Sequence, residues 1–169
     1  YSTNTFPSWD LAQPFRTLAH NGEINTLKGN INWMKIHEQD MSSSLFKNVK
    51  DLKPVIRSSS DSGALDNVFE LLVHSGKLAP LIKLMMIPDA WSKRSKTVPK
   101  NHQDLFNFLN STIEPWDGPA AICATDAKWV LASSDRNGLR PLRYSITSDD
   151  LFFAGSETGM IKIPEEKII

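Results

Sequence analysis

The polar tripeptide His20-Asn21-Gly22 follows an apolar approach, and its residue types could stabilise a developing negative charge. Asn21 carries an amide that can donate two hydrogen bonds, and Gly22 has a backbone N–H that a substrate can approach closely. Two such donors side by side can form an oxyanion hole, which stabilises the tetrahedral intermediate of acyl transfer. Asn-Gly is also the commonest two-residue hairpin turn, and the tripeptide taken alone favours the turn.

A second candidate group is Asp61, which lies in the serine-rich run S-S-S-D-S-G at residues 58–63. Its carboxylate could bind the ammonium group of an amino-acid substrate. An acidic residue here, directly before an apolar stretch with helical spacing, is also a common helix-capping group that stabilises by about 1 kcal/mol. Taken alone, this stretch favours the cap.

The remaining histidines and the single cysteine offer less chemistry. The four histidines have no metal-ligand spacing, so we expect no metal site, and only His20 borders the candidate chemistry. Cys123 lies in an apolar run without the cationic or helix-terminal setting that activates a thiol, so we expect it to be a core residue. One cysteine also excludes an internal disulfide, which suits a reducing compartment.

Composition excludes several classes of partner. Nineteen basic and nineteen acidic side chains cancel, so the chain has no electrostatic footprint for nucleic acid or for an anionic membrane surface. The most apolar window, residues 78–87, is too short to span a bilayer. The 169 residues can bury one core, and because the chain starts at Tyr1 and ends on two isoleucines, we expect one domain truncated at both ends.

The elements that must position these groups follow from periodicity and turn signals. Helices are expected from Asn30 or Asn32 to Gln39, over 64–75 after a cap at Ser60 or Ser62 and a stop at Gly76, over 78–86, and over 101–112 with Leu105, Phe106, Phe108 and Leu109 inward. Strands are expected over 1–6, up to residue 22, and as an antiparallel meander over 118–125, 129–134, 139–146 and 151–154. This order predicts an α+β fold with layered sheets.

Five motifs in order along the chain are more specific than any one of them. They are YSTNTFPSW at 1–9, AHNGEINT at 19–26, SDS at 60–62, DRNGLRP at 135–141 and SETG at 156–159. Together they resemble the glutaminase domain of the glutamate synthase large subunits, and the resemblance covers essentially the whole chain. The wider family is the class II glutamine amidotransferases. The resemblance therefore implies part of an N-terminal-nucleophile (Ntn) hydrolase fold, a four-layer αββα sandwich.

The resemblance also implies a reaction. In this family an N-terminal cysteine attacks the side-chain amide of L-glutamine, ammonia leaves, and water hydrolyses the resulting thioester. Asn21 and Gly22 match the oxyanion-hole positions. Thr3 and Asp61 match positions that hold glutamine, Asp61 through the substrate ammonium, and His20 is assigned to the same substrate-binding group. The family's N-terminal cysteine and the arginine before its Tyr-Ser-Thr motif are absent here, so we expect the chain alone to be inactive.

In the parent enzyme that the resemblance implies, ammonia is transferred to 2-oxoglutarate to make L-glutamate. FMN and an iron–sulfur cluster are expected in parent domains outside this chain and no cofactor within it. The expected partners are those domains and a small subunit or ferredoxin as electron donor, in the bacterial cytoplasm or in a plastid. The alternatives are a phosphoribosyl or hexosamine amidotransferase, or a non-catalytic αββα binding module. The helical insertion over 78–112 and the sequence of the motif at 135–141 favour glutamate synthase.

Overall fold

The computed structural model describes residues 7–90 and 97–169. The strand predicted over 1–6, and with it Thr3, lies outside these described residues. The described part combines helices with two antiparallel sheets, so the α+β class is as predicted. The strands are β1 (Leu18–Gly22), β2 (Ala120–Thr125) and β3 (Val130–Ser134), hydrogen-bonded in that order, and β4 (Arg143–Ile146) with β5 (Phe152–Gly155).

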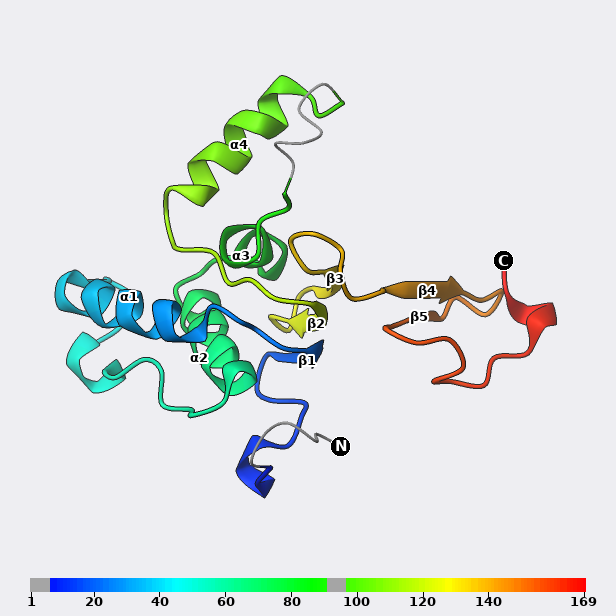
Figure 1. The fold of residues 1–169 in the computed structure, drawn as a ribbon, viewed down its shortest axis with the longest axis horizontal. Coiled ribbons are helices and arrows are strands. Elements are labelled where there is room, and N and C mark those ends of the chain that lie inside the picture. Colours follow the sequence, from blue (N-terminus) through cyan, green and yellow to red (C-terminus); the bar gives the residue numbers. More distant parts are fainter. Residues whose placement is uncertain (1–6, 91–96) are drawn as a thin grey trace.

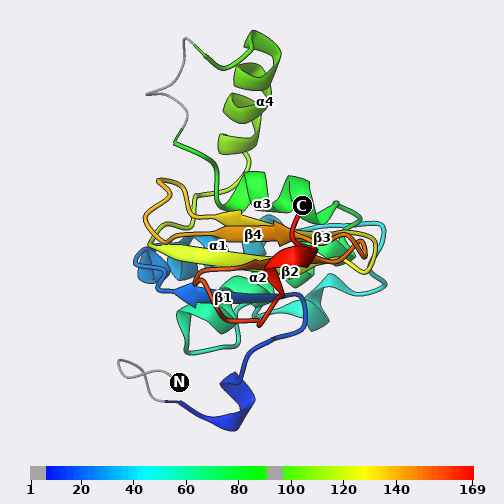
Figure 2. The ribbon, with the colours of Figure 1, turned by 90° about the vertical axis from the view of Figure 1, so that its right-hand side faces the viewer.

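Helices cover one face of the three-stranded sheet, and the β4–β5 hairpin stands on the opposite side (Figures 1 and 2). The helices are α1 (Leu27–Asp40), α2 (Asp61–His74), α3 (Ala79–Met86) and α4 (Lys100–Asn110). Short 3-10 helices span Trp9–Leu11, Val49–Leu52 and Glu165–Lys167. None of the helices within the described residues is long and apolar enough to cross a membrane.

The core lies between the sheet and helices α1 to α3. Leu18, Ile122 and Ala124 face the helices, since cross-strand partners in the sheet share one face. From the helix side, Leu65 and Ile82 are completely buried. Burying each of these side chains contributes about 1.5–3 kcal/mol, so this interface fixes where β1 and the start of α2 lie relative to each other.

Helix α2 begins and ends as local signals predict. The Ser60 hydroxyl accepts the backbone N–H of Gly63 at 3.0 Å, which makes Ser60 the N-cap. After the helix, Gly76 adopts φ +86°, and the N–H groups of Gly76 and Lys77 donate to the carbonyls of Val73 and Leu72. This is the Schellman arrangement that glycine favours at a helix C-terminus.

Helix α1 begins earlier than predicted, at Leu27, with Thr26 as its N-cap residue. Asn30, which the sequence offered as a cap, lies inside the first turn and is buried. Its amide accepts from the Thr26 hydroxyl at 2.6 Å and donates to the carbonyl of Pro115 at 3.1 Å. The prediction was wrong because the Asn30 side chain bonds the Thr26 hydroxyl and the distant Pro115 carbonyl, and not a backbone N–H of the helix.

Two further predictions were wrong. In α4 only Leu109 is buried, whereas Leu105 and Phe108 are exposed, because this helix projects beyond α3 (Figure 1). The four C-terminal strands do not form one meander, because the chain leaves the first sheet after β3. There the Asp135 carboxylate accepts four backbone N–H groups, from Ala120, Asn137, Leu139 and Arg140, at 2.9–3.0 Å, and folds the loop back over the start of β2.

Candidate active site

Strand β1 carries the candidate oxyanion hole. Asn21 and Gly22 pair with Ala121 and Ala120 of β2, so the tripeptide ends a strand and does not form a hairpin turn. The turn that the tripeptide alone favoured is therefore wrong. The residues of the tripeptide suit either a hairpin turn or a strand end, and pairing with β2, far along the chain, makes it a strand end.

The backbone of Gly22 meets the requirements for close approach. Its φ is +145°, and a Cβ there would collide with the carbonyl oxygen of Pro119. Along β1 the N–H groups of Leu18 and His20 donate to side chains, away from β2. Because N–H directions alternate along a strand, the N–H of Gly22 also points to the edge that β2 does not cover. That is the direction an oxyanion donor at this edge must take.

The side chain of Asn21 is held by a residue to which the sequence gave no role. Asn21 Nδ2 donates to Ser156 Oγ at 2.8 Å, and Ser156 is buried. An amide nitrogen has two hydrogens, so this bond fixes the amide plane and leaves one donor for a ligand. Ser156 belongs to the SETG motif at 156–159, and that motif was the only sequence signal that could have pointed to it.

Asp61 is the first residue of α2, and its carboxylate contacts the segment that follows β1. Asp61 Oδ2 accepts the backbone N–H of Ile24 at 2.8 Å, two residues beyond Gly22. The side chain is 15% exposed, which leaves the carboxylate accessible to a ligand. The capping role that the sequence favoured belongs to Ser60, and Asp61 instead links α2 to the end of β1.

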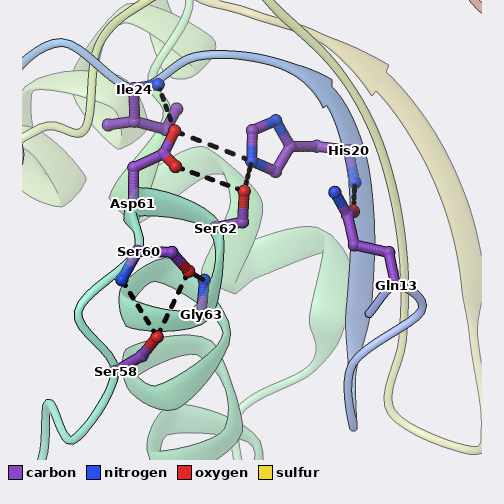
Figure 3. A network of polar contacts seen from close by, with 8 residues as sticks. All are labelled: Gln13, His20, Ile24, Ser58, Ser60, Asp61, Ser62 and Gly63. Carbon is purple, nitrogen blue, oxygen red and sulfur yellow. Dashed lines mark hydrogen bonds and ion pairs between the residues drawn. The ribbon is translucent and has the colours of Figure 1, made fainter. Parts of the chain in front are cut away.

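The imidazole of His20 lies beside Asp61 and is buried, with its side chain only 1% exposed (Figure 3). His20 Nε2 lies 2.5 Å from Ser62 Oγ and 4.0 Å from Asp61 Oδ2. Burial lowers the pKa of His20 below its usual value, although the Asp61 carboxylate acts in the opposite direction. Burial therefore favours the neutral form of His20, and the assignment of His20 to substrate binding stays a prediction.

Cys123 is half-buried on the sheet face away from the helices. Burial raises the pKa of the Cys123 thiol, which disfavours the nucleophilic thiolate. Within residues 7–90 and 97–169 no group of three or more His, Cys, Asp or Glu side chains is arranged to hold a metal ion.

A cavity of about 700 Å³ lies elsewhere, between residues 10–16, the 46–58 loop and the outer side of α2. The lining residues do not include Asn21, Gly22 or Asp61. Two of its charged groups are already paired, since Arg16 contacts Glu70 at 3.1 Å. Its volume alone therefore does not make it the candidate site.

Comparison with known proteins agrees with the motifs. The family model described as "Glutamine amidotransferases class-II" matches residues 1–169. The chain is 58% identical to the "Glutamate synthase [NADPH] large chain" of Azospirillum brasilense, 49% to the "Glutamate synthase [NADH]" of Saccharomyces cerevisiae and 44% to the "Ferredoxin-dependent glutamate synthase" of Antithamnion sp.. Each match covers 100% of this chain but only 8–11% of the relative. Because the family model spans every residue, and with it all five motifs, the chain belongs to the class II glutamine amidotransferases.

Proposed function

We propose that this chain is part of the glutamine-hydrolysing domain of a glutamate synthase, which releases ammonia from L-glutamine for transfer to 2-oxoglutarate. The bond between Asp61 Oδ2 and the Ile24 N–H carries this proposal. It fixes a partly exposed carboxylate at the end of the strand that presents Asn21 and Gly22. A cation-binding group and two oxyanion donors at one strand end suit a substrate with an ammonium group and a reacting amide.

The proposed roles divide between binding and catalysis. Asp61 binds the α-ammonium of glutamine, which is charged throughout the reaction. A cysteine thiolate, supplied by the complete protein, attacks the side-chain carbonyl carbon, and the carbonyl electron pair moves onto oxygen. Asn21 Nδ2 and the Gly22 N–H stabilise that oxyanion. When the carbon–oxygen double bond re-forms, the amine takes up the proton that the thiol gave to its base and leaves as ammonia. Water then hydrolyses the remaining thioester to glutamate and the free thiol.

The finer fold assignment, an αββα sandwich, is part of the same proposal. The face of the first sheet that points away from the helices carries small side chains, including Ala19, Ala121 and Cys123. On that side stands the β4–β5 hairpin, whose Tyr144 and Phe152 are exposed. A second sheet built on this hairpin and packed on the small-residue face would complete the two central layers.

Cofactors and electron donors belong to parts of the relatives that this chain does not span. One cysteine cannot supply the thiolates of an iron–sulfur cluster, so the chain's own residues do not fit that group. FMN and the cluster remain a proposal for the rest of the complete protein. The relatives' names include NADPH, NADH and ferredoxin forms, so the small subunit and ferredoxin stay alternative proposed partners.

The test is ammonia release from L-glutamine by the complete protein that carries this sequence. We expect hydrolysis, blocked by a thiol-alkylating reagent. Cys123→Ala is the control, and this variant should retain both the activity and its sensitivity to alkylation, because the reacting thiol is another one. No ammonia from glutamine, or activity abolished by Cys123→Ala, would contradict the proposal.

A further inference from the structure

We propose that His20 and Ser62 are positioning residues that set the Asp61 carboxylate for recognition of the substrate ammonium. The inference rests on the proposed function and adds to it a hydrogen-bond relay from His20 through Ser62 to Asp61. The relay ties the substrate-binding carboxylate to the same strand that carries the oxyanion donors.

In the relay, each oxygen of the Asp61 carboxylate has a hydrogen-bond partner (Figure 3). Asp61 Oδ2 accepts the Ile24 N–H at 2.8 Å, and Asp61 Oδ1 lies 3.4 Å from Ser62 Oγ. Ser62 Oγ lies 2.5 Å from His20 Nε2. One oxygen is thus held by a backbone N–H, and the other receives a longer contact from a hydroxyl, so both oxygens have a partner that orients the carboxylate.

The direction of the relay follows from what each group can donate. Ser62 has a single hydroxyl hydrogen, and a carboxylate is a stronger acceptor than a neutral imidazole nitrogen. The Ser62 hydroxyl therefore donates to Asp61, and its oxygen accepts the N–H of His20 Nε2. This places the proton of the neutral imidazole on Nε2. Nδ1 is then the unprotonated nitrogen, and it has no hydrogen-bond partner within the part of the chain that the structure describes.

His20 is itself held by the strand and its neighbours. The backbone N–H of His20 donates to Gln13 Oε1 at 2.6 Å, and the imidazole is enclosed on the helix-facing side of β1. A group with 1% exposure cannot readily reach the substrate, but it can act through Ser62. Because Asn21 follows His20 directly, one strand orients the ammonium-binding and the oxyanion-binding groups together.

The experiment uses the complete protein and compares glutamine with glutaramic acid, which lacks only the α-amino group. The readout is the ratio of the glutaramic acid inhibition constant to the KM for glutamine. Ser62→Ala should lower this ratio by about tenfold, the effect of one lost hydrogen bond to a charged group. KM should rise, while kcat and the inhibition constant change little. His20→Gln, which keeps a donor near the Nε2 position, should retain more of the ratio than His20→Leu.

Ser60→Ala is the matched control, because it removes a hydroxyl from the same helix start without touching Asp61. It should lower the melting temperature and leave the ratio unchanged. An unchanged ratio in Ser62→Ala, or an equal fall in Ser60→Ala, would overturn the inference. If the relay is overturned in this way, the proposed function still stands provided that the wild type hydrolyses glutamine and Asp61→Asn lowers the ratio of the inhibition constant to KM. Absence of wild-type hydrolysis would instead overturn the proposed function.

Discussion

Asn21 can serve as an oxyanion donor only if its amide is held with one hydrogen free. The bond from Nδ2 to Ser156 Oγ does this, because it uses one of two hydrogens and fixes the plane of the amide. The geometry gives Ser156 an indirect part in the reaction, through the orientation of Asn21. Pre-orientation of this kind lowers the barrier because no reorganisation is needed as charge develops.

Replacing Ser156 by alanine should therefore reduce kcat more than it changes KM. We expect a loss of about tenfold, smaller than removal of the donor itself, because the amide remains present but can rotate. Ser156→Thr keeps the hydroxyl and should recover part of the rate. Steady-state kinetics of glutamine hydrolysis by the complete protein measures both constants, and an effect confined to KM would contradict this role.

The sequence pointed to the candidate tripeptide but not to the residues that surround it. Asn21, Gly22 and Asp61 were identified from residue types and motifs, and the structure places them on β1 and at the start of α2. Ser156 and Ser62 were missed as functional residues. A serine carries no spacing signal by itself, and Ser156 meets Asn21 only because the chain returns to β1 after more than a hundred residues.

At the scale of elements, predictions succeeded where the information was local. Helix α2 was bounded by its serine cap and by Gly76, which act within a few residues of the helix ends. Helix α4 was misjudged because its apolar spacing indicates a face without indicating whether another element covers it. The break between β3 and β4 depends on Asp135, whose carboxylate binds the N–H of Ala120 across the sheet.

Asp135→Asn should destabilise the fold strongly. Each carboxylate oxygen accepts two N–H groups, so an amide NH2 in place of one oxygen would face two donors. Leaving two donors that are at least part-buried unpaired costs about 2–4 kcal/mol of unfolding free energy. Asp149→Asn is the control, because Asp149 forms an exposed ion pair with Lys167, and exposed pairs contribute little to stability. Denaturant unfolding of the 169-residue chain compares the two variants, and equal losses would contradict the role of Asp135.

The same carboxylate predicts a pH dependence of stability. Burial would raise the pKa of Asp135, but the backbone hydrogen bonds outweigh it and hold the pKa below its usual value. An acid whose pKa is lower in the folded state than in the unfolded state stabilises the fold fully above its unfolded pKa, which is about 3.9 for Asp. This contribution is lost as the pH falls through the folded-state pKa. The stability difference between wild type and Asp135→Asn should therefore shrink below about pH 4. A difference that stays constant into more acidic solution would show that ionisation of Asp135 is not the cause.

At the scale of the whole molecule, the β4–β5 sheet leaves apolar side chains uncovered within the described residues. The β4–β5 hairpin exposes Tyr144 and Phe152, whose rings stack at 5.9 Å, together with Ile146. Contiguous apolar surface of this kind marks an interface. In the proposed sandwich another layer of the complete protein covers this face. The chain spans only 8–11% of the length of its relatives.

The 169-residue chain alone should therefore bind a hydrophobic fluorescent dye. The double variant Tyr144→Ser, Phe152→Ser should reduce the dye fluorescence, because it removes the stacked pair at the centre of the exposed surface. Trp9→Ser is the control, since Trp9 is 95% exposed and its 3-10 helix, Trp9–Leu11, lies away from the hairpin (Figure 1). Dye binding that is absent, or that depends on Trp9 and not on the hairpin, would contradict an uncovered sheet face.

The most direct test of the account is the kinetics of Asn21→Ala in the complete protein. An oxyanion donor acts in the transition state more than in the bound substrate. We therefore expect kcat for glutamine hydrolysis to fall by roughly 10²–10³-fold with KM little changed. Asn21→Asp should be at least as damaging, because a carboxylate would face the developing negative charge. A raised KM with an intact kcat in Asn21→Ala would contradict the oxyanion assignment.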